Sequence, residues 1–508
     1  MFSTMPRKYY QVATQAFLIV LFAVSVFRAF TQSIVHDEAL TWQWYILAPV
    51  SQIFKVFSPN HHFLYTILAR LSTAMFGVSE WALRLPALVS AALYFFACYR
   101  FTRAAFGDGF TMLLSVCLLT LNPLVLDFMV AARGYGMALA LWMLSAALLL
   151  EESMHPRSTR YTMLAGAALA LSVTANLVFV LPAAALAAIA AFLILRRREV
   201  AAPLAAEPAK NTKHAKRKKK KAAVPTPQHT GSRLGPVVVF AIPIVVIAFL
   251  FLTLAPIEGI RAEDLYTGAA GIGGSLRSLG ASSFEHSGPL RNQHWLHGWT
   301  NVVAFGIAPL VLAAAMVWGI LRRNLVLIVP SGAAVFSAIC LLFIHMLFDR
   351  PYPADRTGIY FLAVAALSLA GLAYEWRNAH GPIRAASIGA YILAVIFVLQ
   401  YATEFNTRKF LVWEYDADTR AIADRLATDR SQNAAVTRIG GSWQLQPVLR
   451  FYTYVRNWTW AELTEGPPAA GLDYYALLAW ERDTVEGNLG LKEIYRGPVS
   501  GSVLAKPK

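Results

Sequence analysis

Charged residues are scarce in this 508-residue sequence. They make up 15% of it, whereas 57% of the residues are hydrophobic. Soluble globular domains have about 25% charged residues, so the composition excludes an ordinary soluble protein. Long apolar runs instead predict an α-helical polytopic membrane protein.

Cysteine is also rare, and nucleotide-binding motifs are missing. Cys98, Cys117 and Cys340 all lie in apolar runs, so no disulfide framework is expected. There is no G-x-x-x-x-G-K-[ST] loop, and the glycine-rich residues 271–274 lack the flanking strand and helix of a dinucleotide fingerprint. Nucleotide binding is therefore unsupported.

The net charge of +16 comes largely from one lysine tract within residues 199–235. This segment has no apolar period, so it cannot bury enough surface to fold, and we predict a disordered basic linker. A solvated cytoplasmic loop is the favoured interpretation, and binding to anionic lipid headgroups is the alternative. Because this one tract contributes about half of the net charge, the basicity does not indicate a nucleic-acid-binding face, and no nucleic-acid partner is expected.

Apolar runs predict about eleven membrane spans in a domain of residues 1–402. They lie near residues 11–30, 84–100, 110–128, 135–151, 161–176, 178–195, 236–254, 301–320, 325–347, 357–373 and 385–402. With the N-terminus inside, every inside segment is basic and the acids gather in the outside segments. This pattern predicts a cytoplasmic N-terminus and an extracytoplasmic C-terminus.

Residues 403–508 differ in composition and predict a small α/β domain on the outer side. The expected elements are helices over 416–428 and 443–454, strands over 434–439 and 474–480, and a hairpin over 492–505. We find no nucleophile elbow, metal-ligand spacing or phosphate loop in this domain. An accessory or acceptor-orienting role is the resulting hypothesis.

Polar residues that follow the first span form the leading candidate site. Asp37 and Glu38 come directly after the apolar run, and His61 and His62 form a second polar group. Ionisable groups at a membrane boundary are costly to desolvate, so they are candidates for function, and a wet loop is the alternative. Adjacent side chains do not face each other. A single base acting with a phosphate leaving group therefore fits better than a glycosidase carboxylate pair.

Two arginines in the predicted outside segments need an explanation, because the positive-inside rule disfavours them there. Arg133 and Arg356 each immediately precede an apolar span, at headgroup depth. A guanidinium can donate two parallel hydrogen bonds to phosphate oxygens. The two arginines thus predict a lipid-phosphate site, with snorkelling or ion-paired loop residues as the alternative.

At these residues the chain resembles the GT-C membrane glycosyltransferases, over about residues 10–400. The resemblance is to bacterial relatives of protein O-mannosyltransferases and of the lipid A aminoarabinose transferase (glycosyltransferase family 39). It is carried by the Asp-Glu pair, Asn-His-x-x-Leu-Tyr at 60–65, Arg-Leu-Pro at 84–86, Ala-Arg-Gly-Tyr at 132–135 and a late Asp-Arg. His62 stands where relatives often have proline.

The resemblance implies an inverting enzyme that takes a hexosyl or pentosyl group from a polyprenyl-phosphate carrier. It implies Asp37 as catalytic base, with Glu38 beside it, and Arg133 and Arg356 as donor-phosphate ligands. Further expected substrate contacts are His61, His62, Arg84, Tyr135 and Asp355. No cofactor is certain, and a divalent metal ion is left open. The expected partners are the donor, a glycan, lipid or protein acceptor, and lipids of a bacterial inner membrane.

Two other functions stay open. A lipid-linked-sugar flippase or other transporter would move its substrate without turnover of the carrier bond. Coupled transporters usually need charges at mid-membrane, and no predicted span has one near its middle. A non-enzymatic membrane scaffold would display the outer domain and tolerate replacement of Asp37.

Overall fold

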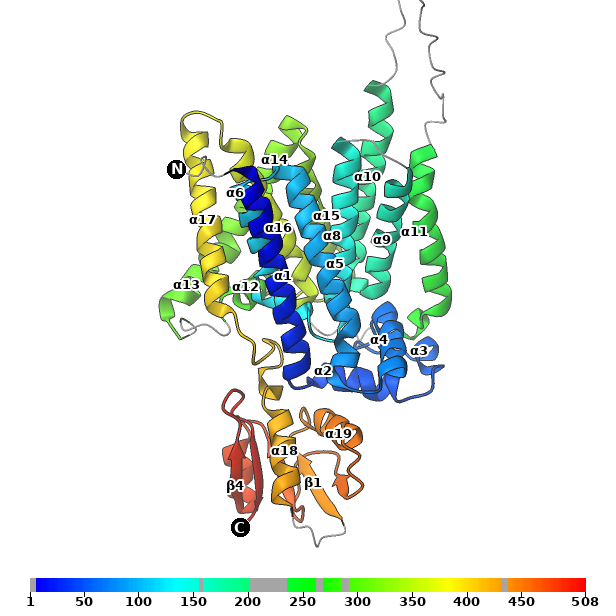
Figure 1. The fold of residues 1–508 in the computed structure, drawn as a ribbon, viewed down its shortest axis with the longest axis vertical. Helices are drawn as coiled ribbons and strands as arrows, with labels where there is room; N and C mark the ends of the chain where they lie inside the picture. Colours follow the sequence, from blue (N-terminus) through cyan, green and yellow to red (C-terminus); the bar gives the residue numbers. More distant parts are fainter. Residues whose placement is uncertain are drawn as a thin grey trace, which may run out of the picture.

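The structure is a computed structural model that describes residues 6–154, 159–200, 235–261, 268–285, 290, 292–430 and 436–508. The predicted linker over residues 199–235 falls almost entirely outside these ranges. The described part is a bundle of long helices with a small mixed α/β domain at one end (Figure 1). The prediction of a helical membrane protein with a small C-terminal domain is therefore confirmed.

Eight helical segments are long and apolar enough to cross a membrane. They are α1 (Arg7–Thr31), α5 (Glu80–Phe106), α8 (Gly134–Met154), α11 (Gly235–Leu254), α13 to α14 (His294–Arg322), α15 (Leu325–Phe348), η6 to α16 (Asp355–Trp376) and α17 (Pro382–Glu404). The other predicted runs give α6 (Phe110–Thr120), α9 (Thr159–Ala175) and α10 (Val180–Val200), which are not among the eight. The predicted count of about eleven spans is thus not confirmed.

The predicted span over residues 110–128 is broken, for a local reason. α6 ends at Thr120, and α7 (Pro123–Phe128) starts a new direction with proline at its first position. Proline has no backbone N–H and is tolerated at that position. The side chain of Asn122 caps the new helix by accepting a hydrogen bond from the Val125 N–H at 3.3 Å.

Short helices gather at the end of the bundle that faces the small domain. The first loop forms α2 (His36–Thr41), the π-helical η1 (Trp42–Ile46), α3 (Gln52–Lys55) and α4 (Phe63–Phe76), as Figure 1 shows. The segment before α13 (His294–Val302) contains α12 (Ile272–Phe284), which was not expected from the sequence. The 3-10 turn η6 (Asp355–Gly358) precedes α16 (Ile359–Trp376).

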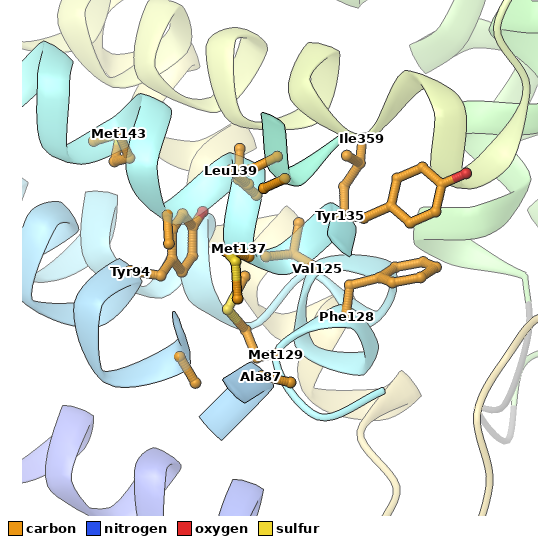
Figure 2. Packing of buried hydrophobic residues seen from close by; sticks show 14 of the residues in the cluster. Ala87, Tyr94, Val125, Phe128, Met129, Tyr135, Met137, Leu139, Met143 and Ile359 are labelled. Atoms are coloured by element: carbon orange, nitrogen blue, oxygen red, sulfur yellow. The ribbon is translucent and has the colours of Figure 1, made fainter. Parts of the chain in front are cut away.

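The corner before α8 is shaped by close backbone approach. A Cβ added at Gly134 would lie 2.1 Å from the Ala175 carbonyl oxygen, and one at Gly136 would lie 2.0 Å from the Phe128 carbonyl oxygen. Figure 2 shows the core around this corner, where Phe128 and Tyr135 lie side by side, with ring centroids 4.9 Å apart. Only glycine fits at the two positions, so the Arg-Gly-Tyr-Gly sequence fixes where Arg133 stands.

The small domain is a five-stranded sheet in the order β2-β1-β3-β5-β4. Its strands are β1 (Thr437–Gly441), β2 (Ala461–Leu463), β3 (Tyr474–Leu477), β4 (Leu491–Arg496) and β5 (Val503–Pro507). β1 is parallel to β2 and β3, whereas β5 is antiparallel to β3 and β4. The helices are η7 (Glu414–Asp416), α18 (Thr419–Asp429), α19 (Gln446–Val455) and α20 (Arg482–Leu489).

The predicted small-domain elements correspond to α18, β1, α19, β3 and the β4–β5 hairpin. β2 and α20 were not predicted, because a three-residue strand has no visible alternation and α20 buries no residue. The second predicted strand was too long, since β3 ends at Leu477 rather than at residue 480.

Candidate active site

Asp37 lies between two guanidinium groups from distant parts of the chain. Its Oδ2 atom is 3.6 Å from Nη2 of Arg133 and 3.5 Å from Nη2 of Arg356. The Asp37 side chain is 11% exposed. Within the described part of the chain, Oδ2 accepts no hydrogen bond. The structure thus brings together the predicted base and both predicted phosphate ligands.

Both arginines keep hydrogen-bonding capacity near Asp37. Arg133 is buried, and its Nη1 atom donates weakly to Thr41 Oγ1 and to the Asn60 carbonyl oxygen, both at 3.3 Å. Its Nε–H has no partner among the described residues. The Arg356 guanidinium lies 5.5 Å from the centroid of the Trp413 ring and is partly exposed. An anion that reached this point would find unused guanidinium donors.

The charges of the two arginines set the protonation state of Asp37. Burial raises the pKa of this carboxyl, but Arg133 and Arg356 outweigh burial, and the net pKa lies below its ordinary value. Asp37 is therefore ionised at neutral pH and can accept a proton. An anion bound to the arginines would offset part of their charge and raise the pKa of Asp37.

Glu38 has a different environment from its neighbour. Its two oxygens accept from Arg84 Nε at 2.9 Å, Arg84 Nη2 at 2.6 Å, the Val35 N–H at 3.0 Å and the Ala132 N–H at 2.6 Å. Glu38 is 1% exposed. The carboxylate expected to act beside Asp37 is thus fully engaged in holding α2 against α5 and the Arg133 corner.

Arg84 is also fully engaged with the protein. Besides Glu38, its guanidinium donates to the carbonyl oxygens of Ala29 at 3.2 Å, Gln32 at 2.8 Å and Ser33 at 2.7 Å. Together with the two hydrogen bonds to Glu38, these three use all five N–H donors of the Arg84 guanidinium. Arg84, expected as a substrate contact, therefore has no donor left for one and joins α5 to the end of α1.

His61, His62 and Tyr135 form an aromatic group beside the arginines. The His61 ring stacks on Tyr45 at 4.4 Å, and the His62 ring meets Tyr135 edge-on at 5.0 Å. Burial lowers the pKa of His61 to about 4 and the pKa of His62 well below its usual range. Both imidazoles are neutral at pH 7, and both Nε2 atoms are buried without a partner among the described residues.

Asp355 faces α12 rather than Asp37. Its Oδ1 atom accepts from Ser278 Oγ at 2.5 Å and from Ser282 Oγ at 2.9 Å. Its φ angle of 46° is left-handed, which non-glycine residues rarely adopt. Asp355 therefore fixes η6 on α12 and so orients the following Arg356, whereas a substrate contact had been expected.

The segment that enters the small domain contributes residues that sequence reasoning missed. Asp416 is fully buried, and its Oδ2 atom accepts from the His36 N–H at the start of α2, at 2.7 Å. Burial, reinforced by the charges of Asp37 and Glu38, raises the pKa of Asp416 well above its ordinary value. The acidic and aromatic run Trp-Glu-Tyr-Asp at 413–416, just after the last predicted span, was the available signal.

An apolar cavity of about 370 Å³ lies beside the corner that carries Arg356. Tyr352 and Pro353 of that corner line it, together with residues of α12, α14, α15, α16 and α17. Its lining is almost entirely hydrophobic, which suits a hydrocarbon chain. Among the described residues, no group of three histidine, cysteine or acidic side chains is arranged to hold a metal ion.

The chain matches one family model. The model is described as dolichyl-phosphate-mannose-protein mannosyltransferase, and the match covers residues 60–206. The resemblance to GT-C glycosyltransferases is thereby confirmed over this segment, which includes His61, His62 and Arg133. Asp37 and Arg356 lie outside it. No curated protein sequence matches the chain.

Solved structures with a similar arrangement have low sequence identity. ArnT from Cupriavidus metallidurans bound to undecaprenyl phosphate is 13% identical, with 98% of this chain and 97% of that chain covered and a TM-score of 0.48. The Archaeoglobus fulgidus oligosaccharyltransferase in complex with Zn and sulfate is 12% identical, with 96% and 72% covered and a TM-score of 0.41. At these TM-scores neither likeness carries an argument about function.

Proposed function

We propose that the protein is an inverting glycosyltransferase that uses a polyprenyl-phosphate sugar as donor and a cell-envelope acceptor. The observation that carries this proposal is the buried Asp37 carboxylate between Arg133 and Arg356, 3.6 and 3.5 Å from their Nη2 atoms. A base and an anion site lie side by side, as a displacement with a phosphate leaving group requires. The family match over residues 60–206 supports the same reaction class.

In the proposed reaction, Asp37 removes the proton from an acceptor hydroxyl. The acceptor oxygen attacks the anomeric carbon, and the bond from that carbon to the phosphate oxygen breaks. The electron pair leaves with polyprenyl phosphate, whose new charge is stabilised by Arg133 and Arg356. Attack opposite the leaving group inverts the anomeric carbon.

The donor's lipid chain has a suitable place in this proposal. The apolar cavity borders Tyr352 and Pro353, which precede Arg356 in the same corner. A phosphate at the arginines would therefore have a hydrophobic space next to it for part of the polyprenyl chain. Contacts of Glu38, Arg84 and Asp355 with the protein position the site. The rings of His61, His62 and Tyr135 line one side of it.

We further propose that residues 1–402 form the catalytic membrane domain and that residues 403–508 lie in the periplasm, with the N-terminus in the cytoplasm. In the described part of the bundle, basic residues such as Arg7, Lys8, Arg103 and Arg322 lie at the helix ends opposite the small domain (Figure 1). The positive-inside rule favours this orientation in a bacterial inner membrane.

The test is transfer from a purified polyprenyl-phosphate sugar by wild type and Asp37→Asn in the same membranes. An amide keeps the shape but cannot take a proton, so we expect transfer to fall by about 10²–10⁴-fold. Binding of undecaprenyl phosphate should persist, because both arginines remain. Near-normal transfer by Asp37→Asn would remove the proposed base and favour a transporter.

A further inference from the structure

The carboxyl ends of two parallel neighbouring strands of the small domain, β1 and β3, lie side by side. From the end of β1 the chain turns into α19 and reaches β2 on one side of the sheet. From the end of β3 it turns into α20 and reaches β4 on the other side. In open α/β sheets, ligands bind outside the carboxyl ends of strands where the chain departs in opposite directions.

The two loops at this point are joined by hydrogen bonds. Ser442 Oγ donates to Glu481 Oε2 at 2.5 Å and accepts from the Leu478 N–H at 2.9 Å. The strands approach so closely that a Cβ at Gly441 would lie 2.0 Å from the Ala476 carbonyl oxygen. The two loops are therefore held together at the strand ends, with the Glu481 carboxylate at their junction.

Two tryptophans flank the hydrogen-bonded pair. Trp443 follows Ser442 in the chain and is 60% exposed, and Trp480 precedes Glu481 and is 62% exposed. Burying an indole is strongly favourable, so two indoles left exposed beside the Ser442–Glu481 pair need a reason. Their ring faces are available to a ligand.

The tryptophans are connected to the candidate active site. The Trp443 ring meets the ring of His36 edge-on at 5.3 Å, and His36 is the chain neighbour of Asp37. The Trp480 ring meets Tyr415 edge-on at 6.0 Å, and Tyr415 lies within electrostatic reach of Asp37 and Arg356. A ligand on the two indoles would lie next to His36 and Tyr415, which border the proposed base.

We propose that Trp443 and Trp480 form the acceptor subsite and bind the saccharide part of the acceptor, with Glu481 accepting a hydrogen bond from a sugar hydroxyl. The proposal rests on the proposed function. Sugar rings offer C–H groups that match the negative face of an indole and hydroxyls that match a carboxylate. An anionic membrane surface fits less well, because Glu481 would repel it.

The experiment measures saccharide binding separately from catalysis. Full-length protein in lipid nanodiscs is mixed with oligosaccharides released from the producing cell's envelope, and contact is detected by saturation-transfer NMR. The variants are Trp443→Ala, Trp480→Ala and Trp443→Phe. The matched control is Trp295→Ala on α13, where another indole is 56% exposed. Undecaprenyl phosphate binding is measured on the same samples.

We expect both alanine variants to weaken saccharide binding at least roughly tenfold, as removal of an indole anchor typically does. Trp443→Phe should retain most of the binding, the control should bind like wild type, and undecaprenyl phosphate binding should be unchanged throughout.

The proposal is overturned if wild type contacts none of the saccharides, or if both alanine variants bind them normally. It is also overturned if these variants lose only affinity for anionic vesicles, which would mark a membrane contact. Near-normal transfer by Asp37→Asn would overturn the proposed base without changing these binding measurements, so the two proposals fail separately.

Discussion

The two adjacent carboxylates at the start of α2 should respond to mutation in opposite ways. Glu38 accepts four hydrogen bonds, two of them from Arg84, at 2.6 to 3.0 Å. Replacing Glu38 with alanine would leave two N–H donors of the buried Arg84 guanidinium and two backbone N–H groups without an acceptor, and would leave the Arg84 charge unpaired. Breaking a buried ion pair from one side costs about 3–5 kcal/mol, and we expect Glu38→Ala to lose that much stability.

A double-mutant cycle with Arg84 separates charge from shape. In Glu38→Leu/Arg84→Met no buried charge remains unpaired, so we expect the double variant to recover part of the stability lost in Glu38→Leu or in Arg84→Met. The control is Asp37→Asn, because the Asp37 Oδ2 atom accepts no hydrogen bond among the described residues. That variant should cost less stability than Glu38→Ala, whereas its transfer should fall by about 10²–10⁴-fold.

The assay is unfolding of the detergent-purified protein by sodium dodecyl sulfate, followed by tryptophan fluorescence. Transfer activity is recorded on the folded fraction of each variant. If Glu38→Ala unfolds within about 1 kcal/mol of wild type, the ion pair does not hold α2 as described. A double variant no more stable than the single variants would show that shape, not charge, dominates.

Three other outcomes are expected. Arg133→Lys and Arg356→Lys should weaken undecaprenyl phosphate binding less than Arg133→Ala and Arg356→Ala, because lysine keeps the positive charge but lacks the paired donors of a guanidinium. If all four variants bind it as well as wild type does, the phosphate is held elsewhere. Asp416→Asn should raise the thermal denaturation midpoint at pH 7, because the raised pKa makes folding cost free energy above the ordinary pKa of 3.8, and the gain should vanish near pH 4. A reporter that works only outside the cytoplasm should be active when it is fused after Lys508. A reporter that works only in the cytoplasm should be inactive at the same position.

The sequence was sufficient to predict the fold class and to select Asp37, Arg133 and Arg356, which lie together in the structure. Hydrophobic runs are long and local, so their positions are readable from composition alone. Asp37, Arg133 and Arg356 were picked out because each lies at the boundary of an apolar run. Their mutual distances depend on how the helices pack, and the sequence alone does not give this packing.

The parts that were not predicted depend on contacts between distant segments. Glu38 and Arg84 read as site residues because each is an ionisable group beside a span, and only the packed structure shows that they neutralise each other. Asp416 contacts α2 from 380 positions away, which no local pattern reveals. The break after α6 is different. It was also not predicted, but a local signal for it was present, because Asn122 and Pro123 are typical of the start of a helix.

The start of α2 has a consequence for the order in which the protein matures. Chains emerge from the ribosome N-terminus first. Arg84, which pairs with Glu38, is 46 residues later and is available early in synthesis, whereas Asp416, which accepts from the His36 N–H, is 380 residues later than His36. The nascent chain would therefore hold α2 without the Asp416 contact until the last span is inserted and the terminal domain has docked. A chain truncated before that domain would insert its helices and still lack a finished active site.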